Sequence, residues 1–423
     1  MTVTLFPGPR SGFAEVPVSK SLTHRYLLAS ALSSGVQTLR CLPLSDDPSA
    51  TVRCLRALGI RAVPDENGTF LSVSGALSAQ NGAAELDCGE SGTTLRLLLP
   101  VCAALGIETV FRMGGRLPDR PLGALTEELN AHGAQISKDG SDLICRGRLR
   151  PGAYRIPGDV SSQFVSGLLF ALPLLEGDST LEITTPVESA PYVAMTENVL
   201  SECGPRAESS GEERFFRIEG RQSFRAPANP EIEADWSAAA VFLCAGATSR
   251  DGVTVPGLNE ISLQGDKDVL PILRSFGAEI LFRDGCASVR RGELTGHPVD
   301  ASQIPDLVPV LAAVAAGARG ETVFTRAARL RRKETDRLKT VSAMLNGLGA
   351  DVRETDDGLI VRGRRSLRGG TVSSFGDHRV AMAAAVAAQF CEEPVILEGA
   401  ECVSKSFPSF WDRFSGLKPD PIR

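Results

Sequence analysis

The stretch LTEELNAHGAQISKDGSDLICRG, residues 125–147, carries the pattern on which the fold depends. Its first part resembles a helical segment and ends at Gly133. Its second part contains two short runs typical of strands, separated by a polar turn. The stretch therefore predicts a helix followed by a β-hairpin.

The same pattern occurs five times along the chain. Its copies are residues 54–75, 125–147, 199–220, 272–292 and 344–363. The glycines that end the five helical segments lie 71 to 74 residues apart; they are Gly59, Gly133, Gly204, Gly277 and Gly349. Spacing this regular indicates a structural repeat rather than chance similarity.

A second series of segments lies between these copies, each a short polar loop followed by an almost wholly apolar helical run. The six segments are residues 17–35, 88–106, 158–177, 233–247, 300–317 and 375–390. Their composition predicts buried helices. The first five close at glycines 69 to 71 residues apart, which we expect to take the left-handed conformation that ends a helix. These glycines are Gly35, Gly106, Gly177, Gly246 and Gly317.

The two series together predict six α/β units of about 70 residues, each with two helices and a few strands. The last unit lacks its own hairpin, and we expect the N-terminal segment TVTLF to help complete it. Six units then divide into two domains of three. One domain comprises residues 19–230, and the other comprises residues 1–18 plus 231–423, with prolines 17, 227 and 230 in the linkers.

The composition limits the functional class. The chain of 423 residues is 43% hydrophobic with a net charge of −6, which is typical of a globular protein and argues against nucleic-acid binding. Its N-terminus resembles no signal peptide, and no run of about 18 apolar residues occurs. The ten cysteines form no C-x-x-C pair and no zinc-type spacing. We therefore expect a cytoplasmic protein with no disulfide framework, no structural metal and no membrane-spanning segment.

Charged and hydroxyl side chains collect where the helices begin. In the buried series these are Lys20, Ser21, Arg25, Glu90, Ser91, Arg96, Ser161, Ser162, Gln163, Asp306, Asp377, His378 and Arg379. In the other series they are Arg120, Ser189, Lys333, Glu334, Asp336, Arg337 and Lys405. Equivalent positions of a repeat fall at one end of a domain, and helix N-termini attract anions. The pattern therefore predicts a site for a substrate with several negative charges.

Each set also has a structural explanation. Ser161 and Ser162 are typical helix caps, KETDRL (333–338) suits a solvated first turn, and DHR (377–379) suits an exposed ion-paired group. Arg120 has Asp119 and Glu127 as nearby partners. The recurrence of such sets at matching phases of the repeat favours the binding site over these separate explanations.

The motifs VSKSLTHR, GESGTTLR, DRPLGAL, GDVSSQF, IPD, KETDRL, GDHR and SKSFP occur in this order between residues 18 and 408. In this combination they closely resemble the motifs of the 5-enolpyruvylshikimate-3-phosphate (EPSP) synthase family, also called 3-phosphoshikimate 1-carboxyvinyltransferases. The resemblance implies an inside-out α/β barrel of two domains, each with three βαβαββ units. It also implies transfer of the enolpyruvyl group of phosphoenolpyruvate to the 5-hydroxyl of shikimate 3-phosphate, a step of aromatic amino acid biosynthesis that glyphosate inhibits. The implied reaction uses no metal and no organic cofactor, and we expect the chain to be a monomer.

By this resemblance, the shikimate 3-phosphate site consists of Lys20, Ser21, Arg25, Ser161, Ser162, Gln163, Ser189, Tyr192, Asp306 and Lys333. The phosphoenolpyruvate site consists of Lys20, Gly92, Arg120, Gln163, Arg337, His378, Arg379 and Lys405. The addition step removes a proton from the hydroxyl and adds one to the methylene carbon. We expect Asp306 to act as the base, with Lys405 as the alternative, Glu334 to act as the acid, and Lys20 to assist catalysis.

The sequence departs from the commonest family pattern at several positions. Val18 stands where glycine is usual, His24 where asparagine or serine is frequent, Glu90 where asparagine is frequent, and Gly376 where asparagine precedes DHR. Two rival functions remain. A UDP-N-acetylglucosamine enolpyruvyl transferase shares the resemblance but uses a cysteine in a mobile loop, and the matching residues 113–122 contain none. The other rival is a non-catalytic anion-binding repeat protein.

Overall fold

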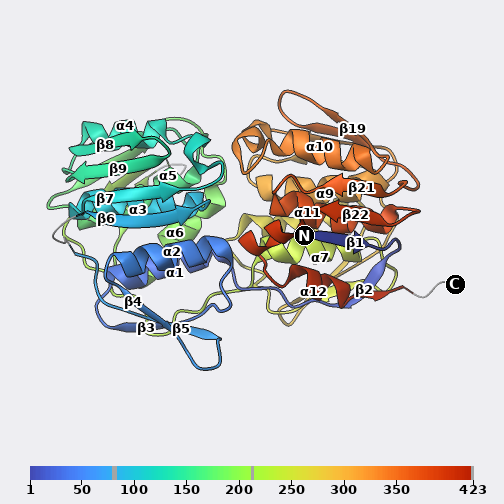
Figure 1. Ribbon diagram of the computed structural model, residues 1–423, viewed down its shortest axis with the longest axis horizontal. Coiled ribbons are helices and arrows are strands. Elements are labelled where there is room, and N and C mark those ends of the chain that lie inside the picture. The colour runs from blue at the N-terminus through green and yellow to red at the C-terminus, as the bar shows by residue number, and fades with distance from the viewer. Residues whose placement is uncertain (79–82, 211–213, 421–423) are drawn as a thin grey trace. The chain divides into compact units, whose positions relative to one another are not determined.

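The computed structural model describes residues 1–78, 83–210 and 214–420. The chain divides into two compact units (Figure 1). The N-terminal unit comprises Val18–Ile232, and the C-terminal unit comprises Met1–Pro17 together with Glu233–Arg423. The described residues form six sheets, three in each unit.

Two repeats of the N-terminal unit show the complete βαβαββ order. The first of them consists of β6 (Ala84–Gly89), α3 (Gly92–Leu105), β7 (Thr109–Met113), α4 (Gly123–Ala131), β8 (Ala134–Asp139) and β9 (Asp142–Gly147). The next consists of β10 (Ala153–Ile156), α5 (Ser162–Ala171), β11 (Ser179–Ile183), α6 (Ala190–Cys203), β12 (Ala207–Ser210) and β13 (Phe215–Ile218). In both repeats the first two strands are parallel and the last two form the antiparallel hairpin that the sequence predicts.

The first repeat of the N-terminal unit lacks a leading strand of its own. It consists of α1 (Lys20–Leu32), β3 (Val36–Arg40), α2 (Asp46–Ala57), β4 (Arg61–Pro64) and β5 (Phe70–Ser74). The backbone that leaves the third repeat lies beside β3, where Phe224 forms a parallel bridge with Ser33 and the Thr38 amide donates to the Ala228 carbonyl at 2.7 Å. The end of the unit therefore closes onto its beginning.

The C-terminal unit has the same plan. Its elements are α7 (Trp236–Gly246), β14 (Val253–Val255), α8 (Val269–Ser275), β15 (Glu279–Arg283), β16 (Cys286–Arg290), β17 (Val299–Asp300), α9 (Val308–Gly317), β18 (Glu321–Thr325), α10 (Arg337–Gly347), β19 (Asp351–Glu354), β20 (Leu359–Arg362), β21 (Gly370–Ser373), α11 (His378–Ala387), β22 (Val395–Glu398), α12 (Phe410–Ser415) and β23 (Lys418–Pro419). The start of the chain adds two strands. β1 (Thr2–Leu5) pairs antiparallel with β22, and β2 (Arg10–Phe13) lies parallel to β14.

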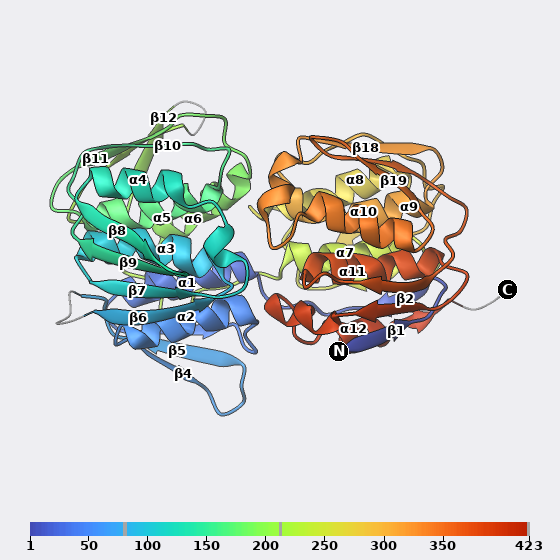
Figure 2. The ribbon, with the colours of Figure 1, turned by 45° about the horizontal axis from the view of Figure 1, so that its top comes forward.

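Apolar helices fill the inside of each unit, as the composition of the second series predicts. α7, α9 and α11 pack against one another, and α3 packs against α5 (Figures 1 and 2). In α9 all residues from Val308 to Ala316 are buried. The strands carry the alternation of a sheet with one buried face; in β18, for example, Thr322 and Phe324 are buried while Glu321 and Thr325 are exposed. No helix within the described ranges is long and apolar enough to cross a lipid bilayer.

The expectation for the glycines that close the buried helices is correct at Gly35 and Gly106, which have positive φ angles, and wrong at three others. Gly246 and Gly317 are the last residues of α7 and α9, and Gly177 likewise has no positive φ angle. Close packing explains two of them. A Cβ atom on Gly246 would overlap the Val289 carbonyl oxygen, and one on Gly317 would overlap the Phe390 ring.

This packing predicts that Gly246→Ala destabilises the protein. Helix propensity alone favours alanine over glycine by about 1 kcal/mol, but the methyl group would meet a backbone atom, and overpacking of this kind costs about 1–3 kcal/mol. We expect a net loss in the free energy of unfolding, measured by urea denaturation. Gly416→Ala is the control, because its Cβ would lie 3.4 Å from its nearest neighbours. A stabilised Gly246→Ala protein would contradict the packing argument.

Candidate active site

The predicted binding residues of the N-terminal unit lie at the N-terminal ends of four helices. Lys20 is the first residue of α1, Gly92 of α3 and Ser162 of α5, and Ser189 caps α6. The residues that precede three of these helices, Ser19, Ser91 and Ser161, accept hydrogen bonds from backbone amides in the first turn. Ser161 therefore acts as a cap, and the positive ends of these helices carry the predicted binding residues.

Lys20 is held by an acidic residue of the next helix. Its ammonium nitrogen lies 2.9 Å from Oδ2 of Asp47 on α2, and both side chains are largely buried. The pair holds the positive charge at the N-terminal end of α1. Asp47 was not among the residues predicted for the site.

Arg25 is buried and surrounded by neutral groups. It donates to the Thr196 hydroxyl at 2.8 Å, to the Ser166 hydroxyl at 3.2 Å, and to the carbonyl oxygens of Ser21 and Tyr192 at 2.7 Å each. Burial lowers its pKa to about 10. The structure thus brings Arg25, Ser21 and Tyr192 together, and the hydroxyl and carbonyl groups that accept from Arg25 carry no formal charge.

Two guanidinium groups flank Gly92. A Cβ atom on Gly92 would lie 3.0 Å from terminal nitrogens of both Arg96 and Arg120. Arg96 also donates to Oε1 of Gln163 at 2.8 Å, and Nε2 of Gln163 donates to the Thr93 hydroxyl at 2.7 Å. The absence of a side chain at Gly92 therefore leaves room for the guanidinium groups of two different elements, as an anion site requires.

Glu90 lies close to this group of residues. Its carboxylate covers Gly115 in the loop of residues 113–122, where a Cβ atom would overlap it. The Gly114 amide donates to the Gly89 carbonyl at 2.7 Å. Glu90 therefore packs against the loop that supplies Arg120.

In the C-terminal unit a single arginine joins three acidic residues. Arg337 is 2% exposed, and its guanidinium lies 2.8 Å from Asp306, 2.7 Å from Glu334 and 2.8 Å from Asp377. Burial opposes its charge, but the carboxylates of Asp377, Glu334 and Asp306 together raise its pKa above the ordinary value. The arrangement brings the predicted base and the predicted acid onto the same guanidinium.

Asp306 has further cationic neighbours. Lys333 lies 3.8 Å and Arg379 3.5 Å from its carboxylate. Burial by itself would raise the pKa of Asp306, but Lys333, Arg379 and Arg337 outweigh it and hold that pKa well below its ordinary value. The pKa of Lys333 is lowered to about 8, chiefly by burial. Asp306 is therefore an ionised carboxylate.

His378 and Lys405 are the remaining predicted residues of this unit. His378 is buried at the start of α11, with Nδ1 3.9 Å from Oδ1 of Asp377. Lys405 is buried at the end of a 3-10 helix, Ala400–Lys405, which packs against α11. His378 therefore lies beside Asp377, whose carboxylate caps α11 by accepting from the Arg379 amide at 2.9 Å. Lys405 lies on an element that contacts α11.

Two of the structural explanations from the sequence are wrong. KETDRL is not a solvated first turn, because α10 begins only at Arg337, whose side chain is buried in the ion pairs described above. DHR is not an exposed ion-paired group, because Asp377, His378 and Arg379 are all buried. In both cases the physical reason is the same: the charges face one another inside the unit rather than water.

Asp266 is a buried acid that the sequence reasoning missed. It accepts a hydrogen bond from the Ser237 hydroxyl, and the Ser237 carbonyl oxygen accepts one from Arg379 at 3.3 Å. Burial, followed by the charge of Asp306, raises the pKa of Asp266 to about 7. The only local signal was its place just before a helix, because Asp266 lies three residues before Val269, the first residue of α8.

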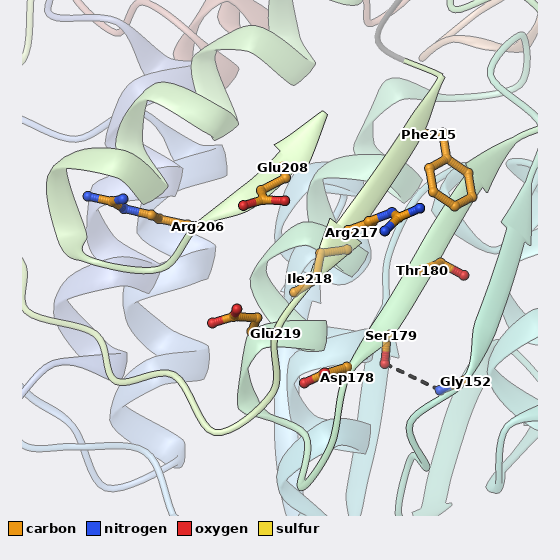
Figure 3. A pocket seen from close by; sticks show the side chains of 10 residues that line it. All are labelled: Gly152, Asp178, Ser179, Thr180, Arg206, Glu208, Phe215, Arg217, Ile218 and Glu219. Atoms are coloured by element: carbon orange, nitrogen blue, oxygen red, sulfur yellow. Dashed lines mark hydrogen bonds between the residues drawn. The ribbon is translucent and has the colours of Figure 1, made fainter. Parts of the chain in front are cut away.

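A separate open hollow of about 640 Å³ lies on the third sheet of the N-terminal unit (Figure 3). Thr180, Arg217 and Glu208 form a cross-strand row there, with charges of opposite sign side by side. None of the predicted site residues lines this hollow. Within the described residues no cluster of acidic, cysteine and histidine side chains is suited to hold a metal ion.

Comparison with solved structures defines the class of protein. An EPSP synthase from Acinetobacter baumannii matches 99% of this chain and 98% of its own with a TM-score of 0.80 and 27% identity. The enolpyruvyl transferase NikO from Streptomyces tendae matches 99% of this chain and 97% of its own with the same TM-score, and at 18% identity it supports the fold alone. The predicted α/β class is confirmed: the fold is the two-domain fold of enolpyruvyl transferases.

Sequence comparison specifies the family. The model of the EPSP synthase (3-phosphoshikimate 1-carboxyvinyltransferase) family matches residues 7–414. A 3-phosphoshikimate 1-carboxyvinyltransferase of Clostridium kluyveri is 42% identical over 98% of this chain and 97% of its own, and one of Clostridium beijerinckii is 40% identical over 98% and 96%. The chain belongs to the EPSP synthase family, and the predicted transferase activity is confirmed at this level.

The raised pKa of Asp266 predicts a pH-dependent contribution to stability. The folded protein keeps the Asp266 proton up to about pH 7, whereas the unfolded chain releases it near the ordinary value of 3.8. The stability of the wild type should therefore fall, relative to that of Asp266→Asn, as the pH rises from 4 to 7. Denaturant unfolding at several pH values measures this difference.

Asp284→Asn is the control for the loss of one acidic charge in the same unit, because its side chain is 85% exposed. We expect its stability relative to the wild type to change little over the same pH range. A difference between Asp266→Asn and the wild type that does not vary with pH would contradict the protonation of Asp266.

Proposed function

We propose that the chain joins the enolpyruvyl group of phosphoenolpyruvate to the 5-hydroxyl of shikimate 3-phosphate through a tetrahedral intermediate and releases phosphate. Family membership supports this reaction. The observation that carries the proposal is the contact of Arg337 with both Asp306 and Glu334, since two proton transfers on one substrate need an acid and a base held close together.

Shikimate 3-phosphate is assigned to the helix ends around Arg25. Ser161, Ser162 and Ser189 hold its phosphate, because hydroxyls and free amides at helix N-termini suit an anion. The buried cation of Arg25 donates to neutral hydroxyl and carbonyl groups, which supports a carboxylate or phosphate ligand nearby. Lys20, Ser21, Gln163 and Tyr192 complete this group, and Asp306 and Lys333 contribute from the C-terminal unit.

Phosphoenolpyruvate is assigned to the cations around Gly92 and α11. Arg120 and Lys20 contribute from the N-terminal unit, together with Gln163. Arg379, Lys405 and His378 contribute from the C-terminal unit. Arg337 acts mainly by orienting Asp306 and Glu334, because its nitrogens already donate to three carboxylates.

The proposed chemistry balances two protons and one leaving group. In the addition, the 5-oxygen of the substrate bonds to C2 of phosphoenolpyruvate, Asp306 takes the hydroxyl proton, and Glu334 gives a proton to C3. In the elimination, C3 returns its proton to Glu334, the C2–C3 double bond forms again, the C2–O bond to phosphate breaks, and the departing phosphate takes the proton held by Asp306. Arginine and lysine side chains stabilise the departing phosphate. Domain closure is expected to exclude water during these steps.

We also infer that the chain acts as a cytoplasmic monomer. All ten cysteines are free thiols and eight of them are buried, which suits a reducing compartment. Sedimentation of the purified protein tests the monomeric state.

The acceptor decides between the proposed function and the related sugar-nucleotide transferase. We expect phosphate release from phosphoenolpyruvate with shikimate 3-phosphate and none with UDP-N-acetylglucosamine, because residues 113–122 contain no cysteine. We also expect Glu334→Gln to lower kcat by about 100-fold or more with the first acceptor, the range typical of a lost general acid. Continuous phosphate detection measures both.

Glu354→Gln is the matched control, because Glu354 also pairs with an arginine of the C-terminal unit, Arg331, at 3.1 Å. It should retain nearly full activity. Release with the sugar nucleotide alone would assign the chain to the rival transferase, and binding of phosphoenolpyruvate without release would favour an anion-binding protein.

The pH dependence of kcat separates Asp306 from Lys405 as the base. The lowered pKa of Asp306 keeps it ionised, so wild-type kcat should persist below the ordinary range of carboxylates as the pH falls. We expect Asp306→Asn to lower kcat by about 100-fold and Lys405→Met to act mainly on the KM for phosphoenolpyruvate. The reverse pattern would make Lys405 the base.

A further inference from the structure

Four buried polar side chains connect the first three helices of the N-terminal unit. Nδ1 of His24 lies 2.7 Å from the Thr51 hydroxyl, which lies 2.7 Å from the Thr94 hydroxyl, which in turn lies 2.7 Å from the Ser91 hydroxyl. These residues belong to α1, α2, α3 and the N-cap of α3, and each is between 1% and 3% exposed. We call them the His24 chain.

The donor and the acceptor of each hydrogen bond in the His24 chain can be assigned, starting from Ser91. The Thr94 hydroxyl donates to the Ser91 hydroxyl, and its other acceptor, the Asp47 carbonyl at 3.4 Å, has no proton to give. Thr51 must then donate to Thr94, and His24 must donate to Thr51. The proton of His24 therefore resides on Nδ1. Burial lowers the pKa of His24 to about 3, against the opposing charge of Asp47, so the ring is neutral.

The Ser91 and Thr94 end of the His24 chain connects to two residues assigned to phosphoenolpyruvate, Gly92 and Lys20. Ser91 caps α3 by accepting from the Thr94 amide at 3.3 Å, and Gly92 follows it directly. The Thr94 hydroxyl donates to the Asp47 carbonyl, and the Asp47 carboxylate forms the ion pair with Lys20. The chain thus links the helix ends that carry Gly92 and Lys20, while α5 and α6 with Ser161, Ser162 and Ser189 lie outside it.

We propose that the His24 chain sets the positions of Gly92 and Lys20 and that His24 is a positioning residue for phosphoenolpyruvate, which rests on the proposed function. Buried hydrogen bonds of this kind specify one arrangement of the elements that they join. A shift of α3 relative to α1 moves Gly92, and with it the gap between the guanidinium groups of Arg96 and Arg120. The effect should be larger for phosphoenolpyruvate than for shikimate 3-phosphate. Ser161, Ser162 and Ser189 lie on α5 and α6, outside the His24 chain, whereas α1 serves both substrates through Lys20.

The test compares variants that break the chain with variants that keep it. Thr51→Val removes both hydrogen bonds of the Thr51 hydroxyl, and His24→Phe removes one. Each variant should raise the KM for phosphoenolpyruvate about tenfold or more, with kcat within about twofold and a smaller rise in the KM for shikimate 3-phosphate. Thr51→Ser and His24→Asn keep a hydrogen-bonding group at the same place and should retain the wild-type KM. The double variant Thr51→Val with Thr94→Val should lose more than Thr51→Val alone, because the Thr94 hydroxyl also donates to Ser91 and to the Asp47 carbonyl.

Thr23→Val is the matched control, because its buried hydroxyl bonds only to the Ser19 carbonyl of its own helix. The proposal is overturned if Thr51→Val and Thr23→Val have the same effect on the KM for phosphoenolpyruvate, or if His24→Asn loses as much as His24→Phe. If His24→Phe fails to fold, the pair Thr51→Val and Thr51→Ser gives the same comparison.

A spectroscopic measurement tests the chain independently of activity. In protein labelled with ¹⁵N-histidine, the signal absent from His24→Asn should show a neutral ring protonated at Nδ1 at pH 7, and Thr51→Val should shift it. Protonation at Nε2 would overturn the direction of the chain. Wild-type protein without phosphate release but with this signal would contradict the proposed function and leave the His24 chain intact.

Discussion

The interior helices are apolar on all sides, and this constraint determines where polar chemistry is located. A helix such as α9, with every residue from Val308 to Ala316 buried, has no face on which a charge meets water. Free backbone amides and charged side chains are therefore confined to the ends of such helices. Six copies of the same unit repeat this arrangement, so polar residues of distant sequence segments collect at equivalent helix ends.

Two buried arginines, one in each unit, have their charges satisfied in opposite ways. Arg337 is surrounded by three carboxylates, so its charge is balanced within the protein. Arg25 is equally buried but binds hydroxyl and carbonyl groups, which solvate its charge without neutralising it. A buried ion pair broken on one side costs several kcal/mol, whereas a cation bound to neutral groups remains ready for an anionic ligand. This contrast supports the proposed roles of Arg337 beside the acid and base and of Arg25 in anion binding.

The repeat could be predicted from the sequence because the helices and hairpins of each copy depend mainly on local composition and on the spacing of glycines. Hairpins after Gly59 and Gly133, and buried helices at residues 92–105 and 308–317, follow directly from composition and spacing. The ion pairs of the site could not be predicted in the same way, since Lys20 and Asp47 are 27 residues apart and meet only through packing of α1 on α2. Gly246 was misjudged because local rules describe helix ends, while its contact with Val289 is a tertiary one.

Two departures from the common family pattern keep the underlying physics. Gly376 has a φ angle of 73°, with open space where a Cβ atom would lie, and asparagine is the residue other than glycine that enters this region most readily. Glycine and asparagine are therefore alternative solutions to one turn before Asp377. His24 follows the same logic, since an asparagine amide reaches the place of the His24 Nδ1 atom. At Gly376 the fold requires a backbone conformation, and at His24 it requires a hydrogen-bond donor. More than one residue type meets each requirement, so the sequence can vary at these positions without moving the helix ends.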